Sequence, residues 1–123
     1  EKEIEFDVDM MDVEYLGNEN LICHVWDNLL SNAIKFSPCG GTIYIRMMPE
    51  GEKIRFSIEN EGPQISEYSM KHIFDKFYQG DSSHKQEGNG LGLALVKQIL
   101  NLCMGTVSVE NIPGSGCRFT VIL

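Results

Sequence analysis

The chain has 123 residues, of which 42% are hydrophobic and 23% are charged, a composition that is typical of one globular domain and argues against disorder. The net charge of −8 argues against nucleic acid as a partner, because binding to its phosphates needs clustered Lys and Arg. The four cysteines form no Cys-x-x-Cys pair, and this scatter predicts buried, free thiols in a reducing, cytosolic compartment. No apolar run is long enough to span a membrane, and the abrupt start on a charged strand predicts a domain excised from a larger protein.

The first third of the chain contains a strand pattern followed by a helix pattern. In "EIEFDVDM", strict alternation with acidic residues predicts a half-buried strand with the apolar face Ile4, Phe6, Val8 and Met10. "VEYL", residues 13–16, predicts a short second strand. Apolar residues at helical spacing then predict a helix over residues 21–36, which Pro38 and two glycines terminate.

The remaining elements follow from the same two periodicities. Alternation predicts strands over residues 42–48, 53–59, 106–111 and 117–123. Helical patterns cover residues 66–77 and 91–104, and a polar, aperiodic segment at residues 78–89 predicts a mobile loop. Because strands and helices do not alternate regularly, we expect an α+β fold in one domain over residues 1–123, with one sheet covered on one face by helices.

A polar stripe runs along the first predicted helix, in "DNLLSNAIKFS". Asn28, Asn32 and Lys35 are spaced four and three residues apart, so they share one side of the helix beside its apolar side. Asparagine is a poor helix former, and a buried amide without a partner is costly. Amide oxygens with water and phosphate suit Mg²⁺, and an amine can neutralise phosphate. The alternative is an exposed helix face with two incidental asparagines.

Two further motifs bring glycine next to polar residues. In "GNGLGLAL", Gly88, Gly90 and Gly92 lie where the polar loop becomes a helix, a place where backbone amides can approach phosphate. The spacing is neither a Rossmann nor a P-loop motif, and a hinge at a helix start is the alternative. In "IENEGPQI", Asn60 ends a strand just before Gly62 and Pro63, where it can contact the edge of a ligand or only form a turn.

Together, these motifs resemble the ATP-binding catalytic domain of sensor histidine kinases, in the superfamily that includes gyrase, chaperone and mismatch-repair ATPases. "DNLLSNAIKFS" resembles the N box, "IENEGPQI" the first glycine box, and "IFDKFY" the F box with Phe74 and Phe77. "GNGLGLAL" resembles the second glycine box, and "GSGCRFTV" the glycine turn before the last strand. Five boxes in this order are specific, and the resemblance covers essentially the whole chain.

The resemblance implies a two-layer Bergerat fold, with a mixed five-stranded sheet, three helices on one face, and ATP between the helices and a lid at residues 78–89. Asn32, assisted by Asn28, would coordinate Mg²⁺ at the phosphates, and Lys35 would contact phosphate. Asn60 would meet the adenine amino group. The other residues implied at the base, the phosphates or the lid are Gly62, Ile65, Phe77, Lys85, Gly88, Gly90, Leu91 and Gly92.

Three residues refine this expectation. Asn28 stands where the hydrolytic members of the superfamily have a glutamate base, and an amide cannot take a proton, so phosphoryl transfer is favoured over ATP hydrolysis. Asn60 replaces the usual aspartate, so its NH₂ group must find an acceptor besides the nucleotide. Gln64 replaces the second glycine of its box, which changes the turn and the pocket rim.

The family resemblance also implies partners. None of the three histidines is followed by an acidic residue, so the acceptor histidine is expected on a separate dimerisation domain of the same parent protein. A response-regulator receiver domain would then take the phosphoryl group, and the parent is expected to be a membrane-bound sensor kinase of which this piece is a cytosolic domain. A non-catalytic module of the same fold, either a nucleotide sensor or a pseudokinase that acts through protein contacts, is the alternative, and a self-standing serine kinase of the anti-sigma type is a third reading.

Overall fold

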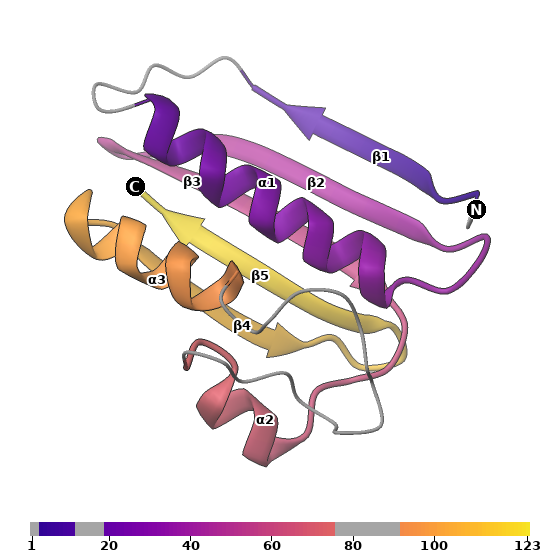
Figure 1. The fold of residues 1–123 in the computed structure, drawn as a ribbon. Helices are drawn as coiled ribbons and strands as arrows, with labels where there is room; N and C mark the ends of the chain where they lie inside the picture. Colours follow the sequence, from indigo (N-terminus) through magenta and orange to yellow (C-terminus); the bar gives the residue numbers. More distant parts are fainter. Residues whose placement is uncertain (1–2, 12–18, 76–91) are drawn as a thin grey trace.

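A mixed sheet of five strands forms one layer of the molecule (Figure 1). The computed structural model describes residues 3–11, 19–75 and 92–123. The strands lie in the order β1 (Glu5–Met10), β2 (Thr42–Glu50), β3 (Lys53–Glu61), β5 (Gly116–Ile122) and β4 (Thr106–Asn111). β1 is parallel to β2, whereas the other neighbouring strands are antiparallel. The predicted α+β fold with a mixed five-stranded sheet is therefore confirmed.

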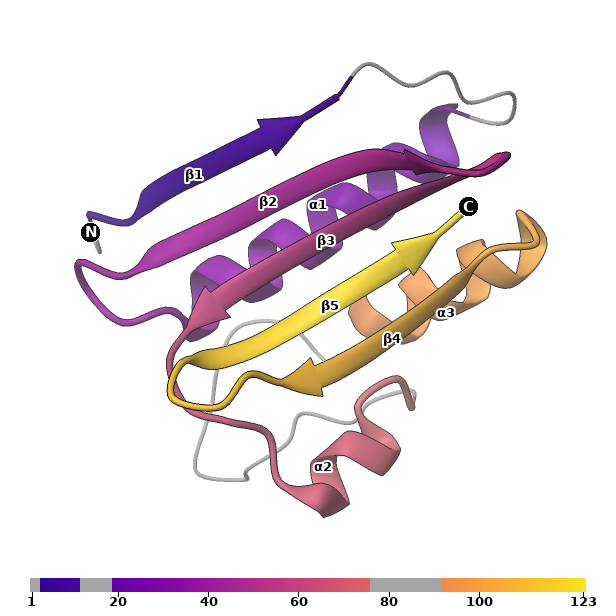
Figure 2. The ribbon, with the colours of Figure 1, turned by 180° about the vertical axis from the view of Figure 1, so that it is seen from behind.

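Three helices occur among the described residues, and two of them form the second layer, instead of the three helices that were expected on one face. α1 (Glu19–Phe36) and α3 (Gly92–Leu102) lie side by side on one face of the sheet, and α2 (Glu67–His72) lies beyond the β4 edge in both views (Figures 1 and 2). Ser66 caps α2 by accepting a hydrogen bond from the Ser69 N–H at 3.1 Å. The helix predicted over residues 66–77 is shorter than expected, because the chain leaves the helix after His72 and packs Phe74 edge-on against Phe119, with ring centroids 6.1 Å apart.

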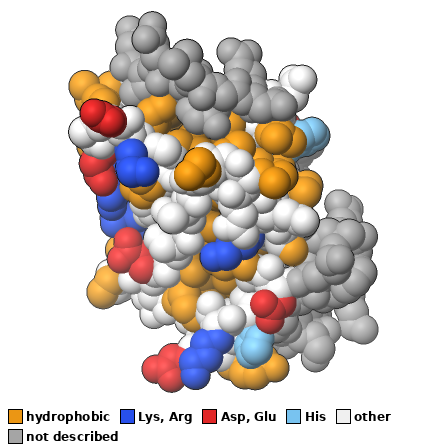
Figure 3. Space-filling view, turned by 90° about the vertical axis from the view of Figure 1, so that its left-hand side faces the viewer, with side chains coloured by type: hydrophobic (Ala, Val, Ile, Leu, Met, Phe, Trp, Pro, Cys, Tyr) orange, Lys and Arg blue, Asp and Glu red, His pale blue; other side chains and the backbone are white. Residues whose placement is uncertain are grey.

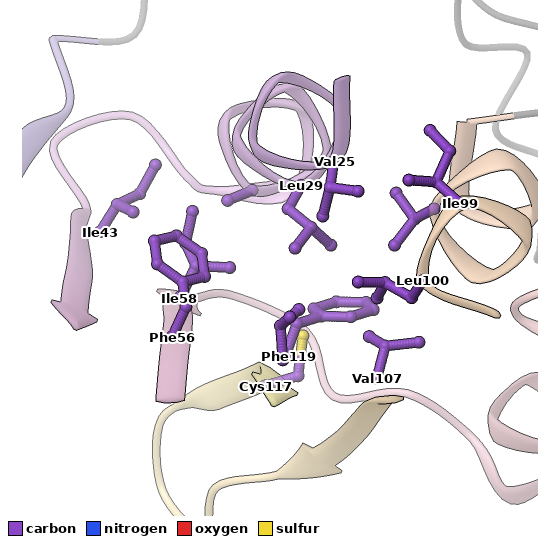
Figure 4. Close-up of a cluster of buried hydrophobic side chains, with 13 residues drawn as sticks. Val25, Leu29, Ile43, Phe56, Ile58, Ile99, Leu100, Val107, Cys117 and Phe119 are labelled. Atoms are coloured by element: carbon purple, nitrogen blue, oxygen red, sulfur yellow. The ribbon is translucent and has the colours of Figure 1, made fainter. Parts of the chain in front are cut away.

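The hydrophobic core lies between the sheet and the pair α1 and α3 (Figure 4). Val25 and Leu29 of α1 and Val96 of α3 are fully buried, as is Val121 of β5. Phe56 stacks on Trp26 with ring centroids 4.2 Å apart. Burial of these side chains is the main favourable contribution to folding, and it fixes the two helices against strands whose ends carry the candidate site.

β1 departs from the predicted half-buried strand. Its alternation is correct, because Phe6 and Val8 stand opposite Ile43 and Ile45, which face the helices. Yet Phe6 is 49% exposed and Val8 is 51% exposed. The prediction of burial is wrong for Phe6, Val8 and Met10, because β1 is an edge strand and α1 lies over β2 and β3 instead of over β1 (Figure 1). Ile4, just before β1, is partly buried against the core.

Exposed hydrophobic side chains also occur where β1, β2 and α3 end, and Figure 3 views this end of the molecule. The exposed hydrophobic residues of these segments are Met10, Met11, Met48, Leu102 and Met104. Among the described residues, no helix is both long and apolar enough to cross a lipid bilayer.

The ends of the other elements are close to the predicted ones. α3 ends at Leu102, not at residue 104, because Met104 has the left-handed φ of 62° and the Gly105 N–H bonds back to the Leu100 carbonyl at 2.7 Å. All four cysteines are described, and each is a free thiol as predicted, but the prediction of burial is wrong for Cys23 and Cys39, which are exposed. The strand predicted at residues 13–16 and the lid predicted at residues 78–89 lie outside the described residues.

Candidate functional site

The amide of Asn28 lies against the first residue of α3. Its Nδ2 donates to the His24 carbonyl, one turn earlier in α1, at 2.8 Å. With the NH₂ group engaged there, the oxygen Oδ1 points to Gly92, where an added Cβ would lie only 3.1 Å from it. The structure thus brings the polar stripe of α1 and the last glycine of "GNGLGLAL" into contact, although 64 residues separate them along the chain (92 − 28).

Asn32 and Lys35 continue the stripe along α1. Both side chains are half-buried, as is Asn28, so the predicted stripe is neither fully solvated nor part of the core. Lys35 lies in the last turn of α1, with its Nζ 5.4 Å from the centroid of the Phe36 ring. The result is a line of two amides and one amine at the boundary between the core and the solvent.

The turn after β3 packs against the end of α1 through Gly62. Gly62 has a φ of +135°, and a Cβ there would lie 2.7 Å from the Phe36 carbonyl oxygen. Only glycine has both the backbone freedom and the small size for this position. The same hypothetical Cβ would be 3.7 Å from Asn60 Nδ2, so Gly62 connects the end of the N box to the asparagine of the first glycine box.

Asn60 is 2% exposed, and both ends of its amide have partners. Nδ2 donates to the Glu61 carbonyl at 2.9 Å, and Oδ1 accepts from the Cys117 thiol at a sulfur–oxygen distance of 3.6 Å. The expectation that the NH₂ group needs an acceptor besides the nucleotide is therefore met by the protein backbone. One N–H and one lone pair of the amide have no partner among these bonds.

Gly116 and Cys117 support Asn60 from β5. A Cβ at Gly116 would lie 2.0 Å from the Asn60 carbonyl oxygen, so the paired strands approach each other as only glycine allows. Burial, with the charge of Glu59 as a smaller cause, raises the pKa of the Cys117 thiol, which stays a neutral donor at physiological pH. Sequence reasoning missed Cys117, and its place directly after the "GSG" turn was the available signal.

Ile65 and Gln64, at the predicted pocket rim, are held by the far end of β4. The Ile65 N–H donates to Asn111 Oδ1, and Asn111 Nδ2 donates to the Ile65 carbonyl, both at 2.8 Å. Gln64 Nε2 donates to the Ile112 carbonyl at 2.8 Å. Sequence reasoning also missed Asn111, which is the last residue of an alternating strand, whereas Asn60 is the last but one of its strand.

The predicted site residues thus divide into two groups. The structure brings Gly92 next to Asn28 in the middle of α1, and it brings Gly62 next to Asn60 and to the C-terminal end of α1. Asn32, Lys35 and Ile65 are also described, whereas the remaining predicted residues lie outside the described part of the chain, and they are Phe77, Lys85, Gly88, Gly90 and Leu91.

A separate hollow of about 320 Å³ lies on the opposite, outer face of the sheet. Its arginines are ion-paired, Arg118 with Glu59 at 3.0 Å and Arg46 with Asp7 at 3.4 Å. These side chains alternate along their strands with the core residues, so this hollow is a solvated polar surface apart from the candidate site.

Comparison with known proteins identifies the class that this fold and site define. Residues 17–123 match the family described as histidine kinase-, DNA gyrase B-, and HSP90-like ATPase, and the chain belongs to this family. It is 35% identical over 121 residues to the heme sensor protein HssS of Staphylococcus saprophyticus, an alignment that covers 98% of this chain and 26% of HssS. The chain therefore spans about a quarter of the length of this curated relative.

Solved structures lead to the same class. The mycobacterial sensor histidine kinase MprB superposes with a TM-score of 0.91 at 28% identity, over 98% of this chain and 83% of that chain. Full-length ShkA, solved in complex with AMPPNP, superposes with a TM-score of 0.82 at 27% identity, over 98% of this chain and 25% of that chain. The chain is thus similar to the catalytic, ATP-binding domain of sensor histidine kinases.

Proposed function

We propose that this chain binds Mg-ATP at the candidate site and donates the γ-phosphoryl group to a histidine on a separate dimerisation domain of its parent sensor kinase. A response-regulator receiver domain would take the group from that histidine. The observation that carries the proposal is the contact between Asn28 and Gly92, which joins the N box to the start of α3. The complex of ShkA with AMPPNP, a relative of the same fold, supports a triphosphate ligand here.

The donor set of the polar stripe fits a magnesium ion. Because Nδ2 of Asn28 is engaged by the His24 carbonyl, the amide presents its oxygen, which is the kind of ligand that Mg²⁺ prefers. Asn32, one turn further, is half-buried on the same stripe and adds a second amide. In this proposal Asn32 and Asn28 hold the ion, which neutralises phosphate charge when bound, and Lys35 contacts phosphate directly.

The base would lie at the other end of the site. Asn60 would meet the adenine amino group through the remaining lone pair of Oδ1, with Gly62 and Ile65 shaping the pocket. Burial of Asn60 in a fixed set of hydrogen bonds supports this role, since a pre-positioned amide loses little entropy on binding. The resemblance alone assigns Phe77, Lys85, Gly88, Gly90 and Leu91 to this site, with the lid at residues 78–89.

Transfer to an external acceptor fits residue 28 better than hydrolysis does. Phosphoryl transfer depends mostly on positioning and on electrostatic stabilisation of the transferred group. An amide at position 28 can orient a ligand but cannot remove a proton from water.

The four free thiols support a reducing, cytosolic location for this part of the parent protein.

Calorimetric titration of ATP, first with Mg²⁺ and then with EDTA, tests the binding step. We expect the wild type to bind Mg-ATP and to lose affinity in EDTA. Asn32→Ala should weaken Mg-ATP binding by about tenfold or more, because a metal-ligating oxygen is lost. Asn101→Ala, at an exposed asparagine of α3, is the matched control and should bind as the wild type does.

If the Asn32→Ala variant keeps the affinity for ATP and the magnesium dependence of the wild type, Asn32 is not part of the binding site. No binding by the wild type in either buffer would contradict the proposed function and favour a pseudokinase that acts through protein contacts. The transfer step is tested with γ-labelled ATP and the purified dimerisation domain of a related sensor kinase, where label should appear on the intact domain and not on its His→Ala variant.

A further inference from the structure

The last residue of the first glycine box, Ile65, is held at the end of β4 by one side chain. Asn111 is the last residue of β4, and its amide makes two hydrogen bonds of 2.8 Å with the backbone of Ile65. Oδ1 accepts from the Ile65 N–H, while Nδ2 donates to the Ile65 carbonyl. Both main-chain polar groups of Ile65 are therefore satisfied by a residue that lies 46 positions away in the sequence.

A turn-forming asparagine would bond within its own turn, and this one does not. Its partners belong to a segment between β3 and α2, so the bonds hold two distant parts of the chain together. Asn111 and Ile65 are both half-buried, and hydrogen bonds shielded from water stabilise more than exposed ones. The exposed bond from Gln64 to the Ile112 carbonyl adds a third, weaker link between the same segments.

The same end of the β4–β5 hairpin also supports Asn60. Asn111 stands opposite Cys117 in the strand pairing, and the Cys117 thiol donates to Asn60. The two residues proposed to contact the base, Asn60 and Ile65, are thus held by neighbouring positions of one hairpin. A rigid support of this kind pre-organises a binding site, so that binding does not have to order it.

We propose that Asn111 is a positioning residue for the nucleotide base, which holds Ile65 at the pocket rim without touching the nucleotide. This inference rests on the proposed function. It requires that the loss of Asn111 affects recognition of the base, whereas the magnesium and phosphate end of the site, on α1 and at Gly92, is left intact. Base selectivity and magnesium dependence should therefore respond differently to the same substitution.

Titration of the wild type, Asn111→Ala and Asn111→Asp with the magnesium salts of ATP and GTP tests the inference. We expect Asn111→Ala to bind ATP about five- to tenfold more weakly, since the net effect of one or two hydrogen bonds is of this order. The ratio of ATP to GTP affinity should fall, and the factor by which EDTA weakens ATP binding should stay unchanged. Asn111→Asp keeps the bond from the Ile65 N–H but places an oxygen against the Ile65 carbonyl, so it should lose affinity similarly.

Asn101→Ala on α3 serves as the control and should leave both ratios unchanged. A folded Asn111→Ala with the wild-type affinity and the wild-type ATP to GTP ratio would overturn the inference while leaving the proposed function intact. An equal loss of base selectivity and magnesium dependence would also overturn it, because it would indicate general loosening. If the alanine variant does not fold, the aspartate variant, which keeps the size of the side chain, decides by the same criteria. A wild type that binds neither nucleotide would reject the proposed function and this inference together.

Discussion

Gly116 and Gly92 both lie against asparagines of the candidate site, but a methyl group would meet different atoms at the two positions. At Gly116, a Cβ would lie 2.0 Å from the carbonyl oxygen of Asn60, a main-chain atom held by strand pairing. At Gly92, it would lie 3.1 Å from Oδ1 of Asn28, the end of a side chain that can rotate. The first glycine is therefore required by the fold, and the second by the site.

The two Gly→Ala variants should separate these requirements. We expect Gly116→Ala to lower the free energy of unfolding by about 3 kcal/mol or more, because paired strands must move apart. Gly92→Ala should stay within about 1 kcal/mol of the wild type, yet weaken Mg-ATP binding by displacing Asn28. Urea unfolding followed by circular dichroism measures the first quantity, and calorimetry the second. A Gly116→Ala variant as stable as the wild type would contradict the close strand approach.

At the scale of elements, a phenylalanine contributes differently to the free energy of unfolding on an edge strand and on a central strand. Phe119 of β5 is 2% exposed and contacts Phe74, whereas Phe6 of β1 is 49% exposed. Both residues belong to alternating patterns and both face the helical side of the sheet. The contribution of each side chain to the free energy of unfolding therefore depends on the strand order, because only the strands under α1 and α3 are covered by helices.

Replacing each phenylalanine by alanine should show this difference. Phe119→Ala should lower the free energy of unfolding by about 3–5 kcal/mol, since it opens a cavity in the core. Phe6→Ala should cost about 1 kcal/mol or less, because much of its surface already contacts water. Urea unfolding of both variants at one pH gives the comparison. Similar losses for the two would mean that Phe6 is covered in solution.

For the whole molecule, the buried thiol of Cys117 makes the free energy of unfolding depend on pH in the alkaline range. Its pKa is raised in the folded state, first by burial and second by Glu59. Below pH 9.0, the ordinary pKa of a cysteine thiol, both the folded and the unfolded chain keep this proton. Above pH 9.0 the unfolded chain releases it and the folded chain retains it, so the free energy of unfolding falls as pH rises.

Urea unfolding of the wild type and of Cys117→Ala between about pH 8 and pH 10 tests this linkage. The free energy of unfolding of the wild type should fall more steeply with pH than that of the variant. The other three cysteines are present in both proteins, so the difference in slope belongs to Cys117. Parallel slopes would show that its thiol titrates alike in the folded and unfolded chains.

Much of the fold follows from local pattern. Helix and strand periodicities predicted α1, α3 and all five strands, because each depends on residues a few positions apart. The ends of α2 and α3 were less accurate, since Phe74 and Met104 are placed by contacts and backbone angles that no local pattern reports. The polar stripe of Asn28, Asn32 and Lys35 was likewise predicted from the spacing of these residues in the sequence, and its role in binding Mg-ATP stays a prediction.

By itself, the sequence determined the types and order of the elements, the family, and the residues that are polar where a core is expected. Only the tertiary structure decided which strand is an edge, and so left Phe6 half exposed. It also decided that Asn111 holds Ile65 and that Gly116 lies against Asn60. Such contacts join residues tens of positions apart, and they form only when the sheet has brought its strands together, so no spacing along the chain records them.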